Sequence, residues 1–229
     1  MQISHSIKDL KIIKQIPRVL KKIAKTNKSF INVIVKKPWG SEFLAHQDKD
    51  LAMWILNIKH NHRTSFHCHM KKKTILYVLK GSILFRSMQI KKKRINAGNY
   101  VSIEKKTFHQ TQAIGKEKCC VLEIETPVDK EDLLRFRDDY NREKLGYEKK
   151  FKAVTPKKIN ILKKKYLLFL KKPEEYKKIL CKHCILLKDL QINKKKYKKG
   201  SILKFKLLKE IASDKIALIK KQEEESNFI

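Results

Sequence analysis

The chain has 229 residues, which is enough for one well-cored domain and either a smaller second part or long extensions. It carries 56 Lys and Arg residues against 23 Asp and Glu, so the formal net charge is +33. Its apolar runs are far shorter than the roughly 20 residues needed to cross a bilayer, and the N-terminus lacks the apolar core of a secretion signal. We therefore expect a cytoplasmic protein without a membrane span.

Lysine carries most of this positive charge, which limits what the charge says about partners. Arginine is the residue that nucleic-acid and bidentate phosphate recognition favour, and the chain has few of them. Aromatic residues that would stack on bases are also sparse among the basic ones. We take a solvated lysine surface as the main explanation and nucleic-acid binding as the weaker one.

The cysteines are five and scattered, at positions 68, 119, 120, 181 and 184. In a reducing compartment free thiols are the default, so we predict no disulfides. Cys181 and Cys184 form "CKHC", which is half of a zinc ribbon or a redox motif. The sequence offers no second pair of ligands near it, and a zinc site there is the weaker hypothesis.

The first element that the sequence predicts is a basic amphipathic helical arm over residues 7–26. Leu10, Ile13, Leu20 and Ile23 recur at roughly helical intervals, and Pro17 marks a break or a new first turn. We expect this arm to pack against the body of the protein or a neighbouring subunit, in preference to a membrane surface.

From residue 30 the pattern changes to short β-type runs separated by lysine- or glycine-bearing bends. Their spacing of about 8 to 12 residues is typical of an antiparallel sandwich or barrel. The runs are FINVIV (30–35), LAMWILNIK (51–59), TILYVLKG (74–81), SILFRS (82–87), NYVSIE (99–104), HQTQAI (109–114) and CCVLEIE (119–125).

After these runs, residues 129–146 predict a helix that closes the barrel. Asp129 is a candidate N-cap, Leu133, Leu134 and Phe136 would face a core, and the helix would stop near Gly146. Beyond Thr155 the composition indicates a small basic α+β appendage. The predicted organisation is a basic arm (1–29), a barrel with its closing helix (30–148) and a C-terminal extension (149–229).

The residues that carry chemistry begin with His67 and His69 in "SFHCH". In a strand these two side chains share a face while Cys68 points away, so they are a natural pair of metal ligands. His109 follows a glycine-led strand and turn and is a third candidate.

The order of these residues resembles the two signature motifs of the cupins, which are small β-barrels of the jelly-roll (double-stranded β-helix) type. The motifs are H-x-H followed by Thr74 and Gly81, and then Gly98 followed by His109. The stretches KKPWGSE (36–42) and LEIETPVDKEDLLRFRDDYNR (122–142) narrow the resemblance. They are similar to the type II mannose-6-phosphate isomerase group, whose barrels also form the C-terminal part of mannose-1-phosphate guanylyltransferases. The resemblance covers roughly residues 33–148.

In that family one divalent metal is held by the H-x-H pair, a glutamate five residues later and the second-motif histidine. The resemblance thus implies His67, His69 and His109 as ligands of Zn, Fe or Mn. Thr74 stands at the glutamate position, Glu104 and Lys106 replace the proline and glycine before the last histidine, and Asn141 replaces a glycine near the end of the motif.

The loss of the glutamate leaves three alternatives open. Three imidazoles can hold a metal alone. A carboxylate can enter from the CCVLEIE strand, where Glu123 and Glu125 share a face. The histidines can also line the barrel and bind a sugar by hydrogen bonds without metal.

Other candidate residues surround this constellation. Lys71, Lys72, Lys73, Arg63 and His62 would lie at the mouth of the site, where the cations could bind a phosphate, unless the lysines are one more solvated run. Trp39 either stacks on a sugar or base or plugs the barrel end. Glu125, Glu123 and His62, in that order, are candidates for proton transfer.

The resemblance implies a sugar-phosphate or nucleotide-sugar isomerase or epimerase of surface-polysaccharide biosynthesis, acting on a small phosphorylated or nucleotide-linked sugar, with a homodimer as the default. The rivals are a three-histidine Fe(II) oxygenase and a non-catalytic, sugar-nucleotide-binding or scaffolding barrel.

Overall fold

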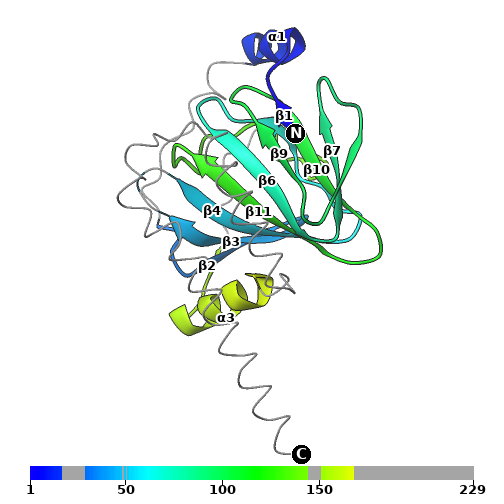
Figure 1. Cartoon of the computed structure of the whole chain (residues 1–229). Helices are drawn as coiled ribbons and strands as arrows, with labels where there is room; N and C mark the ends of the chain where they lie inside the picture. Colours follow the sequence, from blue (N-terminus) through cyan, green and yellow to red (C-terminus); the bar gives the residue numbers. More distant parts are fainter. Residues whose placement is uncertain (17–28, 48, 50, 144–150, 168–229) are drawn as a thin grey trace, which may run out of the picture. The chain divides into compact units, whose positions relative to one another are not determined.

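The computed structural model describes residues 1–16, 29–47, 49, 51–143 and 151–167 (Figure 1). These residues are mainly β. The chain divides into a compact unit Met1–Ile159 and a second unit Asn160–Ile229, of which only the part up to residue 167 is described. None of the described helices is long and apolar enough to cross a membrane.

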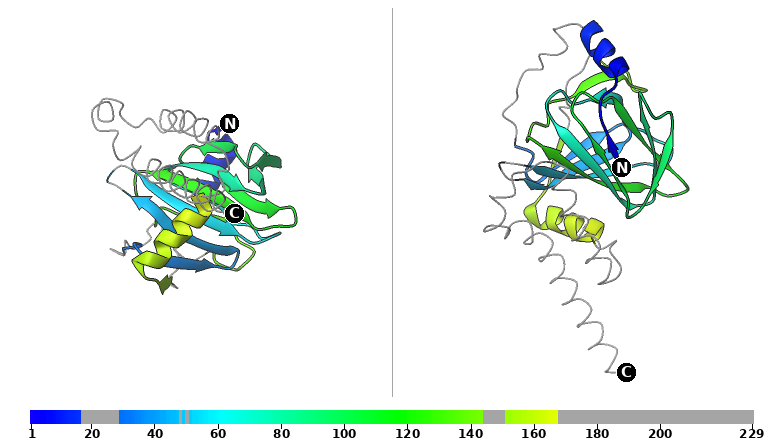
Figure 2. Two further views of the ribbon diagram at one scale, coloured as in Figure 1. Left: turned by 60° about the horizontal axis from the view of Figure 1, so that its bottom comes forward. Right: turned by 45° about the horizontal axis from the view of Figure 1, so that its top comes forward.

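The described strands form two sheets, whose arrangement is visible in Figures 1 and 2. The larger sheet has the order β1 (Gln2–Ile3), β9 (Tyr100–Ile103), β6 (Lys73–Lys80), β11 (Cys119–Thr126), β4 (Ala52–Ile58), β3 (Gly40–Gln47), β2 (Val33–Lys37) and β13 (Phe151–Ala153). The smaller sheet has the order β12 (Leu134–Arg137), β5 (Phe66–Cys68), β10 (His109–Ile114), β7 (Ser82–Ser87) and β8 (Lys93–Asn96). This two-sheet sandwich is consistent with the predicted cupin jelly roll.

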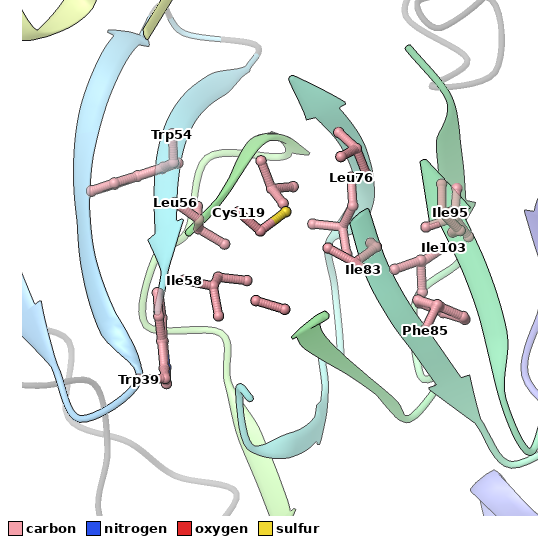
Figure 3. Packing of buried hydrophobic residues seen from close by; sticks show 14 of the residues in the cluster. Trp39, Trp54, Leu56, Ile58, Leu76, Ile83, Phe85, Ile95, Ile103 and Cys119 are labelled. Atoms are coloured by element: carbon pink, nitrogen blue, oxygen red, sulfur yellow. The ribbon is translucent and has the colours of Figure 1, made fainter. Parts of the chain in front are cut away.

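The core lies between the two sheets because alternate residues of each strand turn the same way. On β4 the inward set is Ala52, Trp54, Leu56 and Ile58, all nearly without solvent exposure. Inward side chains from the other strands complete the cluster, and ten of its members are labelled in Figure 3: Trp39, Trp54, Leu56, Ile58, Leu76, Ile83, Phe85, Ile95, Ile103 and Cys119.

The turn between β2 and β3 explains the "PWG" of the sequence. Gly40 has φ +149°, and a Cβ there would lie 1.9 Å from the carbonyl oxygen of Asn57, so no other residue fits. Trp39 is buried in the core cluster, and its carbonyl accepts a hydrogen bond from the Lys59 amide at 2.9 Å. Trp39 therefore packs into the core at this turn.

Each of the seven predicted β-runs contains a strand, but the predicted closing helix over 129–146 is wrong in its described part. Residues Leu134–Arg137 form β12, which pairs antiparallel with β5. Leu134 and Phe136 alternate with two arginines and pack on Phe66 and Cys68, so the period of two prevails over the helical signal. The Asp129 carboxylate caps only a turn, accepting the Asp132 amide at 3.2 Å.

The predicted N-terminal arm begins with helix α1 (Ile7–Gln15), and the rest of the predicted arm, 17–28, lies outside the described residues. The helix packs on the smaller sheet, so it contacts the body of its own chain. After Thr155 the chain forms α3 (Pro156–Leu167). The remainder of the predicted α+β extension, with Cys181 and Cys184, lies outside the described residues. Cys68, Cys119 and Cys120 are free and buried.

Candidate metal centre and its cavity

The three candidate histidines come together where β5 and β10 pair. His109 is the register partner of His67 in this antiparallel pair. His69 stands two residues after His67, just beyond the end of β5. Ring centroids are 4.5 Å apart for His67 and His109, 5.1 Å for His67 and His69, and 5.5 Å for His69 and His109. One nitrogen from each ring lies within 4.8 Å of the others. The predicted trio is thus a buried cluster.

Backbone carbonyls fix the tautomer of each imidazole. The Nδ1–H of His67 donates to the Ser65 carbonyl at 2.8 Å, and that of His109 donates to the Thr107 carbonyl at 3.0 Å. The Nδ1–H of His69 donates to the carbonyl of Asp132. This leaves each Nε2 with a free lone pair, the form in which histidine binds a metal. The buried Nε2 of His69 has no hydrogen-bond partner among the described residues.

The electrostatics keep these rings neutral. Burial, with the neighbouring His109, lowers the pKa of His67 well below its usual range. Burial and the Lys72 ammonium do the same to the pKa of His69. Burial lowers the pKa of His109 to about 4. Neutral imidazoles with orphaned nitrogens fit a divalent metal, so the cluster can hold one.

Thr74 occupies the position at which the resemblance implies a metal-binding glutamate. It is fully buried, and its hydroxyl oxygen has no hydrogen-bond partner among the described residues. Its register partner on β11 is Glu125, whose carboxylate accepts from Trp54 Nε1 at 3.1 Å and from Lys72 Nζ at 2.7 Å. Neither Glu125 nor Glu123 belongs to the metal-ligand cluster of the described residues. Of the three alternatives, the entry of a strand carboxylate is not found among the described residues.

A cavity opens beside the histidines, and five of the predicted site residues line it: Trp39, His67, His69, Lys72 and Glu123. Sequence analysis missed five further charged lining residues, namely Lys37, Glu42, Lys130, Arg135 and Arg142. The signal was present, because all five stand in the two stretches that narrow the family resemblance.

The charged lining residues form buried ion pairs. Glu42 lies 3.5 Å from Lys37 and 3.4 Å from Lys130, which in turn donates to Glu123 at 3.0 Å. Arg142 makes a bidentate pair with Asp138 at 2.7 Å. The wall thus alternates donors and acceptors, an arrangement suited to a polar ligand with several oxygens.

The two buried carboxylates of β11 differ in acidity. Burial raises the pKa of Glu123, more than the Lys130 ammonium lowers it. Burial acts the same way on Glu125, but the ammonium groups of Lys72 and Lys130 outweigh it and leave the pKa of Glu125 below its usual range. The pKa values of the two neighbouring carboxylates are therefore shifted in opposite directions.

The remaining predicted residues do not line the cavity. Lys73 pairs with Glu104 at 2.7 Å, and the exposed Lys71 lies 3.7 Å from Asp129. Arg63 pairs with Asp139 on the surface. His62 bonds through Nδ1 to the His60 carbonyl at 2.8 Å. The predicted triple-lysine mouth thus reduces to the buried Lys72.

Asp132 is an organising residue that sequence analysis did not identify. Its carboxylate accepts the backbone N–H groups of Met70, Lys71 and Lys72 at 2.8, 2.8 and 2.9 Å, while its carbonyl holds His69. It therefore fixes both a ligand ring and the turn that delivers Lys72. Its only sequence signal is its place in the acidic stretch after β11.

Comparison with known proteins gives distant likenesses. No family model matches the sequence, and no curated protein matches it. KdgF from Halomonas sp. is 18% identical with a TM-score of 0.39, over 45% of this chain and 96% of that one. A sugar phosphate isomerase from a cupin superfamily, from Silicibacter pomeroyi, is 12% identical with a TM-score of 0.37, over 43% and 76%. The capsular polysaccharide assembling protein CapF from Staphylococcus aureus is 16% identical with a TM-score of 0.41, over 46% and 34%.

These likenesses are too distant to say what the chain does. The chain's own structure has two informative features, which are a two-sheet sandwich and a buried three-histidine cluster beside a charged cavity. Both are consistent with a cupin barrel able to hold a divalent metal.

Proposed function

We propose that this protein is a metal-dependent cupin enzyme that isomerises or epimerises a sugar phosphate or a nucleotide-linked sugar in surface-polysaccharide synthesis. The observation that carries the proposal is the meeting of three neutral, carbonyl-anchored imidazoles with a cavity walled by lysine and glutamate pairs. His67, His69 and His109 would hold the metal, which as a Lewis acid polarises an oxygen of the substrate.

The chain's own residues would bind the sugar and move the proton. Glu123 lines the cavity and has a raised pKa, which suits a group that takes a proton from carbon and returns it. Lys72 presents its ammonium beside the histidines and would stabilise negative charge that develops on a substrate oxygen. Glu125 would remain ionised and hold Lys72 in place. Trp39 and Arg135 line the cavity and would contact the substrate.

The metal part of the proposal is tested by elemental analysis of protein from cells supplied with Zn, Fe and Mn. The wild type is expected to hold about one metal per chain, and His69→Ala and His109→Ala are expected to lose it. His62→Ala is the matched control and should retain the metal, because His62 does not line the cavity. A wild type with less than about 0.1 metal per chain would show the metal-dependent version to be wrong.

The proton-transfer part is tested in D₂O with a panel of sugar phosphates and nucleotide sugars. We expect enzyme-dependent deuterium incorporation at the carbon beside the carbonyl, and loss of at least about 100-fold of its rate in Glu123→Gln. Exposed Glu117→Gln is the control and should leave the rate unchanged. A metal-loaded wild type that binds sugars without exchanging deuterium would favour the non-catalytic binding barrel.

One observation favours a rival enzyme class, the three-histidine Fe(II) oxygenase. Within the described residues the cluster contains only imidazoles, and no carboxylate shares it. Oxygen consumption that requires Fe(II) and is lost in His109→Ala, without deuterium exchange into sugars, would support this rival. The predicted homodimer and cytoplasmic location stay predictions, and light scattering checks the first of them.

A further inference from the structure

The outer face of the histidine-bearing strands is covered by the first residues of the chain. In β5 and at the start of β10, the ligands turn inward while Phe66, Cys68 and Phe108 turn the other way. These outward side chains form a second apolar cluster with Leu134, to which α1 contributes Ile13. Residues 1–16, here named the N-terminal strap, therefore back the strands that carry all three imidazoles, at the end of the sheets where α1 lies in Figure 1.

Asp9 forms the polar centre of this contact. It is 1% exposed although it belongs to a short surface helix. Its Oδ1 accepts the Phe108 amide at 2.8 Å, across 99 residues of sequence. Its Oδ2 accepts the Ser6 amide at 2.6 Å and the Ser6 hydroxyl, which closes the capping box of α1. One carboxylate thus joins the helix start to the residue next to His109.

The start of the strap is also anchored to the strand that leads to His109. β1 pairs in parallel with β9, and the Ser102 and Glu104 amides donate to the carbonyls of Met1 and Ile3 at 2.8 and 2.9 Å. The segment between Glu104 and His109 is therefore held at one end by β1 and at the other by Asp9. The carbonyl that orients His109, that of Thr107, lies within this held segment.

We propose that the N-terminal strap positions the metal ligands, with Asp9 as a positioning residue that sets His109 through the Phe108 amide. This inference rests on the proposed metal function. The bonds that orient metal-bound histidines typically change metal affinity by 10- to 100-fold when removed. The strap does not bond to the His109 ring itself. It bonds through Asp9 to the Phe108 amide, in the backbone next to His109.

The test compares full-length Asp9→Asn with Ser6→Ala. Asp9→Asn replaces a carboxylate oxygen with an NH₂ group, next to the Ser6 amide, the Ser6 hydroxyl and the Phe108 amide, which are all donors. Ser6→Ala removes part of the helix cap and leaves the bond between Asp9 and Phe108. Titration with Co²⁺, followed by its visible absorption, is expected to show at least a tenfold weaker affinity in Asp9→Asn and less than a threefold change in Ser6→Ala. Equal affinity for Co²⁺ in Asp9→Asn and the wild type would overturn the proposal.

A second readout does not need metal. Amide hydrogen exchange of residues 106–110 in the metal-free protein is expected to accelerate at least about tenfold in Asp9→Asn and to stay unchanged in Ser6→Ala. If the wild type binds no Co²⁺, the proposed function fails, while this exchange still decides whether the strap holds the segment. Unchanged exchange would overturn the positioning role whatever the metal result.

If Asp9→Asn fails to fold, Ile13→Ala tests the apolar half of the same contact. Loss of its packing on Cys68 and Phe108 is expected to weaken Co²⁺ binding at least about fivefold. Ile7→Ala, at a residue 74% exposed on the same helix, is its control and should bind Co²⁺ as the wild type does. Unaltered affinity in Ile13→Ala would contradict the proposal.

Discussion

At the scale of single residues, two positions at which the resemblance expects glycine have a left-handed backbone. Lys106 and Asn141 stand where the resemblance expects glycine, and their φ angles are +64° and +56°. Asparagine tolerates this left-handed region better than lysine does. The Lys106 amide donates to the His69 carbonyl at 2.6 Å, so this conformation links the two motifs. Lys106 thus carries backbone strain that a glycine would not.

Lys106→Gly is expected to raise the free energy of unfolding by about 1 kcal/mol, because glycine adopts this region without a steric penalty. Urea denaturation measures the change. Lys105→Gly, in the same turn, is the control and should lower stability by up to about 1 kcal/mol, since glycine only adds freedom to the unfolded chain. A destabilised Lys106→Gly would mean that the lysine side chain contributes more than its backbone strain costs.

Asp132→Ala is expected to lower the free energy of unfolding by about 3 kcal/mol or more, because three backbone N–H groups lose their acceptor. Thermal or urea unfolding measures this loss. Asp129→Ala removes one turn cap and one long surface ion pair, and it should cost about 1 kcal/mol or less. Similar losses in both variants would argue against the organising role of Asp132.

At the scale of elements, the register between β6 and β11 sets the surroundings of a buried ion pair between Lys72 and Glu125. It sets Thr74 opposite Glu125, and the turn before β6 delivers Lys72 to that carboxylate. Both partners are almost fully buried, because only 1% of the Lys72 side chain and 0% of the Glu125 side chain are exposed. A buried charge without its partner is far less favourable than the intact pair. The fold is therefore stable with both charged side chains of this pair or with neither, and a single one is unfavourable.

Lys72→Met is expected to lower the free energy of unfolding by about 3 to 5 kcal/mol, because Glu125 loses its nearest ammonium. Glu125→Gln keeps an acceptor for Trp54 but leaves Lys72 unpaired, and should also be strongly destabilising. The double variant should lose clearly less than the sum of the two single losses. Additive losses in this double-mutant cycle would show that the two side chains do not stabilise each other.

At the scale of the whole molecule, burial of the histidine cluster between two sheets links stability to pH. The folded protein keeps His67, His69 and His109 neutral far below their usual pKa of 6.5, that of His109 down to about 4. The unfolded chain takes up these protons near pH 6.5. Because the unfolded state then binds more protons, stability is full above about 6.5 and falls as the pH drops toward 4.

For metal-free protein the free energy of unfolding is expected to fall by about 2 kcal/mol per histidine between pH 6.5 and 5. Urea unfolding at a series of pH values measures this slope. His109→Gln should flatten the slope by about one proton, because the variant lacks one of the three rings that the folded protein keeps neutral. An unchanged slope in His109→Gln would contradict the neutral, buried state of this ring.

The sequence by itself determined the mainly β class of fold and the three histidines that cluster. The β-runs are strongly patterned, and H-x-H on a strand places two imidazoles on one face whatever surrounds them. The capping box of Ser6 and Asp9 that begins α1, and the contact of Asp9 with Phe108, came from the structure.

Only the tertiary structure decided which charges face the cavity and what lies behind the ligands. The helix predicted over 129–146 became strand β12, because pairing with β5 and packing of Leu134 and Phe136 outweighed local propensity. Of the three consecutive lysines only Lys72 pairs with the buried Glu125, whereas Lys73 pairs with Glu104 and Lys71 lies near Asp129. Such choices depend on contacts between residues distant in the chain, and local sequence patterns do not encode them.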